Sequence, residues 1–202
     1  MDTYKSYWDL KAHEKEGRDF EVVLRKGTSR VAVVAIHAGA IELGTAEIAR
    51  GIAGENHHLY CFRGIKPSNN RTLHLTANRF DEPRGRGLVE AVDTVIAIHG
   101  CKGDRTEVYV GGRDLELRRK ILRALTKAGF TARESFRPGL KGTHPENICN
   151  RGLSGRGIQL EISEGLRRGM FDVLERRHCR KRTPVYFKFV DAVREGIERK
   201  AS

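Results

Sequence analysis

The sequence predicts a single-domain α/β protein in which a mixed, largely parallel sheet is flanked by helices. Short apolar runs alternate along the chain with stretches of helical periodicity, an alternation that is typical of parallel α/β sheets. Two of these runs, VAVVAIH and TVIAIHG, are almost wholly apolar, as strands buried on both faces are. With 202 residues and no repeat or low-complexity linker, the chain suits one domain spanning residues 1–202.

Six short apolar segments are predicted to be strands: residues 21–25, 31–36, 58–62, 94–99, 107–110 and 157–162. The last of them has an apolar face formed by Ile158, Leu160 and Ile162 and a polar face that carries Glu161. The glycine-rich segment 137–157 shows little periodicity. We therefore expect it to be a long ordered loop near the functional site, because such loops are often functional.

Three helices are predicted between and after the strands. Thr45 is a candidate N-cap for a helix that runs to Ala53, with Glu47 in its first turn. The last helix is expected to begin at Thr183-Pro184, since proline suits the first helical position. The apolar faces of the second and third helices are Leu117, Ile121, Leu125 and Ala128, and Tyr186, Phe189, Val190, Val193 and Ile197.

The composition favours an anionic partner. The chain has 38 Lys and Arg residues against 26 Asp and Glu residues, a net charge of +12, which suits nucleic acid or an anionic substrate. No RNA-recognition motif or phosphate loop is visible, and none of the four cysteines forms a CxxC pair. No apolar run approaches the roughly 20 residues of a membrane helix. The N-terminus lacks a signal-peptide pattern, so we expect synthesis in the cytoplasm, from which lysis could release the protein.

Two of the apolar strands each end in a histidine, His37 and His99, with a glycine close behind. Ligands of open α/β sheets bind beyond the carboxyl ends of the strands. Glu42 follows His37 by five residues and can fold back to the same point. Two histidines and one carboxylate are the usual protein ligands of a catalytic zinc ion. A strand-end histidine is also a common polar residue, so the spacing alone leaves a metal site and a plain polar cluster equally open.

Three further residues are candidates for a role at this site. Glu161 lies in an apolar strand, where an unpaired charge is costly. It could form an ion pair with one of the many arginines, or act as a general base for an attacking water molecule. Asn78 and Arg79 are adjacent in a loop, where arginine can bind a carboxylate bidentately and asparagine can add a donor. Taken alone, this pair fits a solvated loop better.

Five segments, in this order along the chain, carry a resemblance to a known family: HAGAIELGTAEIA (37–49), LYCFRG (59–64), LHLTANRFDEP (73–83), TVIAIHG (94–100) and RGIQLEIS (156–163). They resemble the poly-γ-glutamate hydrolase family, which is similar to the zinc carboxypeptidases and aspartoacylases. The resemblance implies a zinc-carboxypeptidase-like fold and one zinc ion per chain held by His37, Glu42 and His99. It also implies Glu161 as the base and Asn78-Arg79 as the pair that binds a substrate carboxylate.

The resemblance implies a zinc-dependent hydrolase of γ-glutamyl amide bonds. Its partner would be the anionic polymer poly-γ-glutamate rather than a membrane or nucleic acid, and Arg156 is expected to assist the developing oxyanion. The chain departs from the family at Ala38-Gly39, where two glycines are common, and at TAE, where TSE is expected. Two alternatives stay open: a zinc deacylase or carboxypeptidase acting on a small N-acyl amino acid, and a basic nucleic-acid-binding phage protein.

Many basic residues in or beside the matched segments are expected to be plain surface charge. They are Arg63, Lys66, Arg71, Arg84, Lys102, Arg105, Arg151, Arg156, Arg167 and Arg168.

Overall fold

Seven strands form one sheet, in the order β1-β3-β2-β4-β7-β5-β6, in the computed structural model, which describes residues 2–137, 139–176 and 180–198. The strands β2 (Val31–Gly39), β3 (His58–Gly64), β4 (Thr94–Cys101) and β7 (Ile158–Ser163) are parallel neighbours. β1 (Phe20–Arg25) pairs antiparallel with β3, and β5 (Glu107–Gly112) pairs antiparallel with β7 and parallel with β6 (Thr131–Glu134). The predicted mixed, largely parallel sheet is confirmed.

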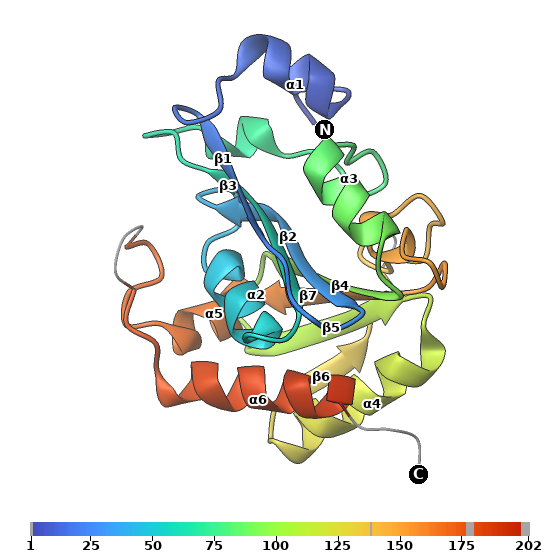
Figure 1. Ribbon diagram of the computed structural model, residues 1–202. Coiled ribbons are helices and arrows are strands. Elements are labelled where there is room, and N and C mark those ends of the chain that lie inside the picture. Colours follow the sequence, from blue (N-terminus) through green and yellow to red (C-terminus); the bar gives the residue numbers. More distant parts are fainter. Residues whose placement is uncertain (1, 138, 177–179, 199–202) are drawn as a thin grey trace.

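Helices cover both faces of the sheet (Figure 1). α1 (Tyr7–His13) and α3 (Pro83–Glu90) lie on one face, and α2 (Thr45–Ala53), α4 (Leu115–Lys127), α5 (Glu164–Met170) and α6 (Pro184–Glu198) lie on the other. Two 3-10 turns, η1 (Asn70–Leu73) and η2 (Ile148–Asn150), interrupt the loops. Within the described ranges, we find no helix with the length and apolar character needed to cross a membrane.

The sheet separates two buried apolar clusters. In β4, Ile96 and Ile98 belong to the cluster that includes α2, α4, α5 and α6, which we call the α2-side cluster. Val95 and Ala97 belong to the cluster that includes α1 and α3, which we call the α3-side cluster. Because alternate residues of a strand face opposite sides of the sheet, a strand that contributes to both clusters must be apolar throughout. This accounts for the runs VAVVAIH and TVIAIHG.

All six predicted strands are present, and so are the three predicted helices. The prediction that Thr45 caps α2 is wrong: Gly44 is the N-cap, in the left-handed region, and Thr45 is the first helical residue. The Thr45 hydroxyl instead donates to the backbone oxygen of Glu42, at 2.8 Å. α6 begins at Pro184, as predicted.

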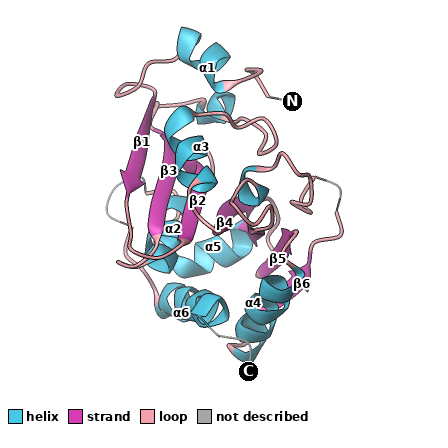
Figure 2. Cartoon of the chain, turned by 45° about the vertical axis from the view of Figure 1, so that its right-hand side comes forward, coloured by secondary structure: helices cyan, strands magenta, loops and turns pink. Residues whose placement is uncertain are grey.

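The glycine-rich segment 137–157 is a loop in which η2 is the regular element among the described residues. η2 packs beside α3, and Ile148 and Cys149 join the α3-side cluster. The segment therefore covers the same face of the sheet as α3 (Figure 2). Arg137, Gly139, Leu140 and Asn147 of this segment form one wall of the site described below.

Candidate functional site

His99 and Glu161 lie near the carboxyl ends of the neighbouring strands β4 and β7. They are direct partners in the parallel pairing of these strands, so their side chains project from the same face of the sheet. Their residues are 4% and 6% exposed, respectively. The apolar residues Ile158, Leu160 and Ile162 of β7 point to the opposite face, into the α2-side cluster. The predicted division of β7 into an apolar and a polar face is confirmed.

An irregularity in β2 brings His37 to the same face. β2 pairs with β3 through Ala35 and then through Ala38, although the corresponding β3 partners, Cys61 and Arg63, are only two residues apart. This extra residue is a β-bulge, and it places Ala35 and Ala38 in the same α2-side cluster. In a regular strand His37 would share the face of Ala35. The bulge turns the His37 side chain away from α2 and toward His99.

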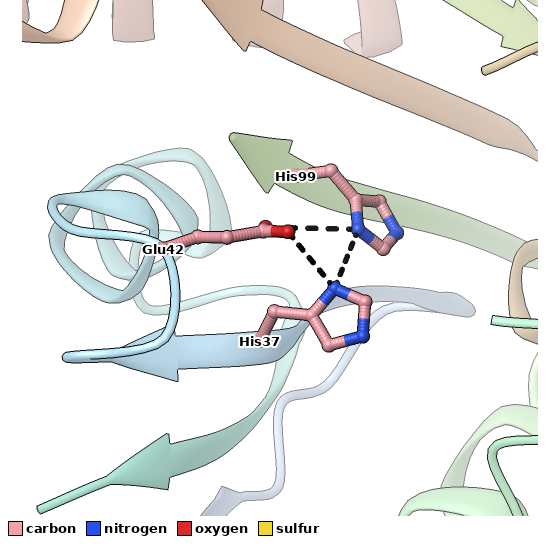
Figure 3. A group of neighbouring side chains, drawn as sticks. All are labelled: His37, Glu42 and His99. Atoms are coloured by element: carbon pink, nitrogen blue, oxygen red, sulfur yellow. Dashed lines mark hydrogen bonds and ion pairs between the residues drawn. The ribbon is translucent and has the colours of Figure 1, made fainter. Parts of the chain in front are cut away.

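Glu42 completes a group of three converging side chains (Figure 3). It lies in the loop between β2 and α2, where its backbone N–H donates to the oxygen of His37 at 2.8 Å. Its Oε1 is 3.1 Å from Nδ1 of His37, and its Oε2 is 3.8 Å from Nδ1 of His99. The two Nδ1 atoms are 3.2 Å apart. One potential ligand atom of each residue therefore lies within 4.8 Å of the others.

Hydrogen bonds behind these atoms fix their orientation. Nε2 of His37 is 2.8 Å from the carbonyl oxygen of Leu75, which can only accept. The proton of neutral His37 therefore sits on Nε2, and Nδ1 presents a lone pair, as in many histidine metal ligands. The N–H of Gly100 donates to Oε2 of Glu42 at 2.8 Å. Nε2 of His99 is buried and has no hydrogen-bond partner among the described residues.

The charge states of these groups suit a cation. Burial lowers the pKa of His99 to about 3. Burial opposes ionisation of Glu42, but the neighbouring His37 and His99 and the Gly100 N–H lower its pKa to about 2. Lone pairs and a carboxylate that face one another at these distances repel unless a proton or a cation lies between them. Two imidazole nitrogens and one carboxylate are the donor set of a catalytic zinc site, so the residues fit such an ion.

Glu161 occupies the position next to this group. Its Oε1 accepts a hydrogen bond from Nε2 of Gln159 at 2.9 Å, so in the described part of the chain its carboxylate binds an amide rather than an arginine. Burial, together with the negative charge of Glu42, raises the pKa of Glu161 well above its usual value. A carboxyl group with a raised pKa is suited to accept and return a proton near neutral pH.

All four residues line one cavity of about 540 Å³, which is within the size range of ligand pockets. Three exposed cations, Arg71, Lys102 and Arg137, also line it. The first two belong to the basic residues expected to be mostly surface charge. Across residues 2–137, 139–176 and 180–198, no salt bridge pairs any of these three cations with a carboxylate. The cavity is therefore positively charged around a buried carboxylate and imidazole cluster.

The structure brings some of the proposed substrate-binding residues to the cavity and not others. Asn78 lines it. The guanidinium of Arg79 instead pairs with Oδ2 of Asp2 at 2.9 Å. Arg156 is exposed and precedes the first residue of β7, whereas Glu161 lies toward the carboxyl end of that strand. Neither arginine lines the cavity.

His74 lines the cavity although nothing in the sequence indicates it. Its ring stacks on that of His37, with centroids 3.9 Å apart. Its Nδ1 donates to Oδ1 of Asp2 at 2.8 Å, and the N–H of Thr76 donates to the other oxygen of Asp2 at 2.7 Å. Asp2 and His74 are separated by 72 positions, so no local pattern connects them.

Comparison with known proteins gives consistent matches. A family model described as poly-gamma-glutamate hydrolase matches residues 4–192. The UPF0714 protein YmaC of Bacillus subtilis is 36% identical over an alignment that covers 100% of this chain and 86% of that protein. The UPF0714 protein YndL of the same organism is 36% identical over 85% of this chain and 68% of its own length.

Two solved structures share the whole fold. That of a bacteriophage poly-gamma-glutamate hydrolase superposes with a TM-score of 0.93 at 31% identity, covering 98% of this chain and 97% of that chain. The zinc-free form of YndL superposes with a TM-score of 0.91 at 32% identity, covering 98% of both chains.

Proposed function

This chain belongs to the poly-gamma-glutamate hydrolase family, and from that membership we propose that it is a zinc-dependent enzyme that hydrolyses the γ-glutamyl amide bonds of poly-γ-glutamate. The observation that carries the proposal is the convergence of Nδ1 of His37, Nδ1 of His99 and the carboxylate of Glu42 on one point of the cavity. The description of a YndL structure as zinc-free supports zinc as the ion.

The residues around this point have separable roles. Zinc, when bound, supplies Lewis-acid polarisation of the amide carbonyl and lowers the pKa of water. Glu161 would accept a proton from the attacking water molecule and return it to the leaving amine. Gln159, which donates to Oε1 of Glu161, would hold that carboxylate in a fixed orientation. Asn78 would offer its amide to the substrate from the cavity wall.

The charge of the cavity supports an anionic polymer as substrate. Each γ-linked glutamate unit carries a free α-carboxylate, so the polymer presents a negative charge at every repeat. We propose that Arg71, Lys102 and Arg137 bind these carboxylates, because all three line the cavity. Arg79 is already neutralised by Asp2, and Arg156 lies away from the cavity. The proposed polymer contacts therefore differ from the Arg79 and Arg156 contacts expected from the sequence.

Metal analysis tests the zinc site. Protein purified without chelator should contain about one zinc ion per chain, and the His37→Ala and His99→Ala variants should lose it. His13→Ala, which alters an exposed histidine on α1, serves as the control and should keep it. Wild-type protein that is metal-free and nevertheless fully active would refute the zinc proposal.

Substrate comparison tests the reaction. The enzyme should release γ-glutamyl fragments from poly-γ-glutamate. Activity confined to small N-acyl amino acids would instead identify a deacylase. A salt-sensitive shift of DNA that survives His37→Ala, without any hydrolysis, would identify a nucleic-acid-binding protein.

A further inference from the structure

A buried arginine lies directly behind the candidate zinc site. Arg167, on α5, is 5% exposed. Its three nitrogens donate to three backbone carbonyl oxygens: Nε to Ile162 at 3.1 Å, Nη1 to Leu43 at 2.6 Å and Nη2 to Cys101 at 3.1 Å. From the sequence, Arg167 is one of the basic residues expected to be mostly surface charge. This expectation is wrong for Arg167, because its side chain is buried. α5 packs against β4 and β7 and carries the side chain inward.

The three carbonyls belong to the three segments that carry the site. Leu43 directly follows Glu42, Ile162 directly follows Glu161, and Cys101 follows His99 by two residues. One planar guanidinium thus binds all three segments at once, a geometry for which its fixed fork of donors is suited.

Gly100 connects the guanidinium to the ligand Glu42. A Cβ atom at position 100 would lie 2.7 Å from Cζ of Arg167, so the guanidinium packs directly against the Gly100 backbone. The N–H of the same residue donates to Oε2 of Glu42. Movement of the guanidinium would therefore displace the donor that orients this carboxylate.

Burying this cation without an acidic partner is costly. Each of its three nitrogens has one carbonyl partner, but no salt bridge among the described residues includes Arg167. Burial lowers the pKa of Arg167, and the negative charge of nearby Glu42 opposes this only in part. An apolar side chain of similar size would remove the buried charge but would leave three backbone carbonyl oxygens without their donor. The three directed donors of the guanidinium are therefore what an apolar side chain at this position could not supply.

We propose that Arg167 is a positioning residue that fixes the separation of Glu42, His99 and Glu161 by holding the three backbone segments together. Arg167 does not line the cavity, so it acts through these residues and not on the substrate. The inference rests on the proposed function insofar as it concerns zinc and the general base.

Zinc affinity provides the first test. In Arg167→Lys and Arg167→Met the zinc dissociation constant, measured by competition with a chelating dye, should rise about 10- to 100-fold, as is typical when a residue supporting a metal ligand is lost. Lysine keeps the charge but not the fork of donors, so it should not restore the affinity. The matched control is Arg168→Lys, because Arg168 is the next residue of α5, is exposed and pairs with Glu164. It should bind zinc within about twofold of the wild type.

Amide hydrogen exchange provides a test that does not depend on zinc. In chelator-treated Arg167→Lys, exchange of the Gly100 N–H should be at least about tenfold faster than in the wild type. The amides of Tyr60 and Phe62 in β3 should exchange at wild-type rates. Gly100→Ala, which keeps Arg167 but crowds its guanidinium, should also weaken zinc binding and is the second variant if Arg167→Met does not fold.

The possible outcomes separate the two proposals. Lower melting temperature with unchanged zinc affinity and unchanged Gly100 exchange would overturn the positioning role and leave Arg167 purely structural. A wild-type protein that binds no zinc would refute the proposed function, while the Gly100 exchange rate would still test Arg167.

Discussion

The two residues after His37 differ in what a side chain at each position would meet. Ala38 is fully buried, and its methyl group packs in the α2-side cluster. Gly39 has a φ of 70°, and a Cβ there would lie 2.5 Å from the oxygen of Gly64. A side chain is therefore tolerated at the first position and excluded at the second. This explains why the departure from two glycines falls at Ala38 and leaves Gly39 in place.

Replacement of Glu161 by glutamine should remove the proposed general base and preserve the proposed zinc site. Glu161→Gln keeps the size of the side chain, and a general base contributes about 10²- to 10⁴-fold to rate. We expect kcat on a γ-glutamyl polymer to fall by at least the lower of these factors, with zinc content unchanged, as measured by steady-state kinetics and metal analysis. Glu116→Gln, an exposed substitution on α4, is the control. Near-normal turnover of Glu161→Gln would remove this residue from the mechanism.

Asp2 should make the stability of the protein sensitive to acid. Burial raises the pKa of this carboxyl, but the hydrogen bonds from Thr76 and His74 outweigh burial and lower it from 3.8 to about 2. A carboxyl with a depressed folded-state pKa contributes stability that is present above its unfolded pKa of 3.8 and is lost as the pH falls through about 2.

Asp2→Asn should remove this dependence. In urea denaturation of chelator-treated protein, the difference in unfolding free energy between wild type and variant should be constant above about pH 5 and shrink from about pH 4 to pH 2. A difference that stays constant across that acidic range would show that the Asp2 interactions do not depend on its charge.

The elements with strong apolar periodicity could be predicted from the sequence, and the others could not. β6 has the sequence TARE and alternates exposed with half-buried residues at the edge of the sheet, so it lacks an apolar pattern. α1, α3 and α5 have seven, eight and seven residues, too few for a clear helical period. α5 also contains two glycines and two arginines, a composition that conceals the burial of Arg167.

The candidate site was predictable in its residue types and not in its geometry. The strand-end histidines and Glu42 stand out in the sequence, whereas the bulge in β2 that turns His37 toward His99 leaves no local signal. The orientation of the Arg79 guanidinium depends on its ion pair with Asp2, which lies 77 positions away. Such long-range pairings are fixed by the tertiary fold and are invisible to spacing.

The bulged end of β2 should tolerate no side chain at Gly39. In Gly39→Ala the left-handed backbone alone costs about 1–2 kcal/mol, and the contact with Gly64 adds to it. We expect a loss of unfolding free energy of at least that size, measured by urea denaturation. Gly169→Ala on α5 is the matched control, because its Cβ would meet nothing within 4 Å and alanine favours helix. Equal stability of the two variants would contradict the strain assigned to Gly39.

At the scale of the whole molecule, the chain as a whole carries an excess of positive charge, and three of its cations line the cavity. The chain has a net charge of +12, and the three cavity cations lie around the only inward-facing acidic pair described there, Glu42 and Glu161. A positively charged cleft attracts an anionic polymer over a distance comparable to the Debye length. The charge is thus expected to act on the rate of encounter more than on the chemical step.

Salt should therefore lower the rate of hydrolysis of the proposed polymer substrate more than that of a short substrate. Raising the salt concentration from about 0.05 to about 0.5 M should lower kcat/KM on poly-γ-glutamate about tenfold. The same change should have a smaller effect on a γ-glutamyl amide that carries a single charge. Parallel salt dependences for the two substrates would argue against electrostatic steering.

The extra residue in β2 sets a condition for anyone who grafts this site onto another parallel sheet. Transplanting the two histidines and the glutamate to equivalent positions of two regular strands would bury one imidazole beneath a helix, among aliphatic side chains. A faithful graft must carry the inserted residue as well, so the smallest transferable unit of this site is an irregular backbone together with its three candidate ligands.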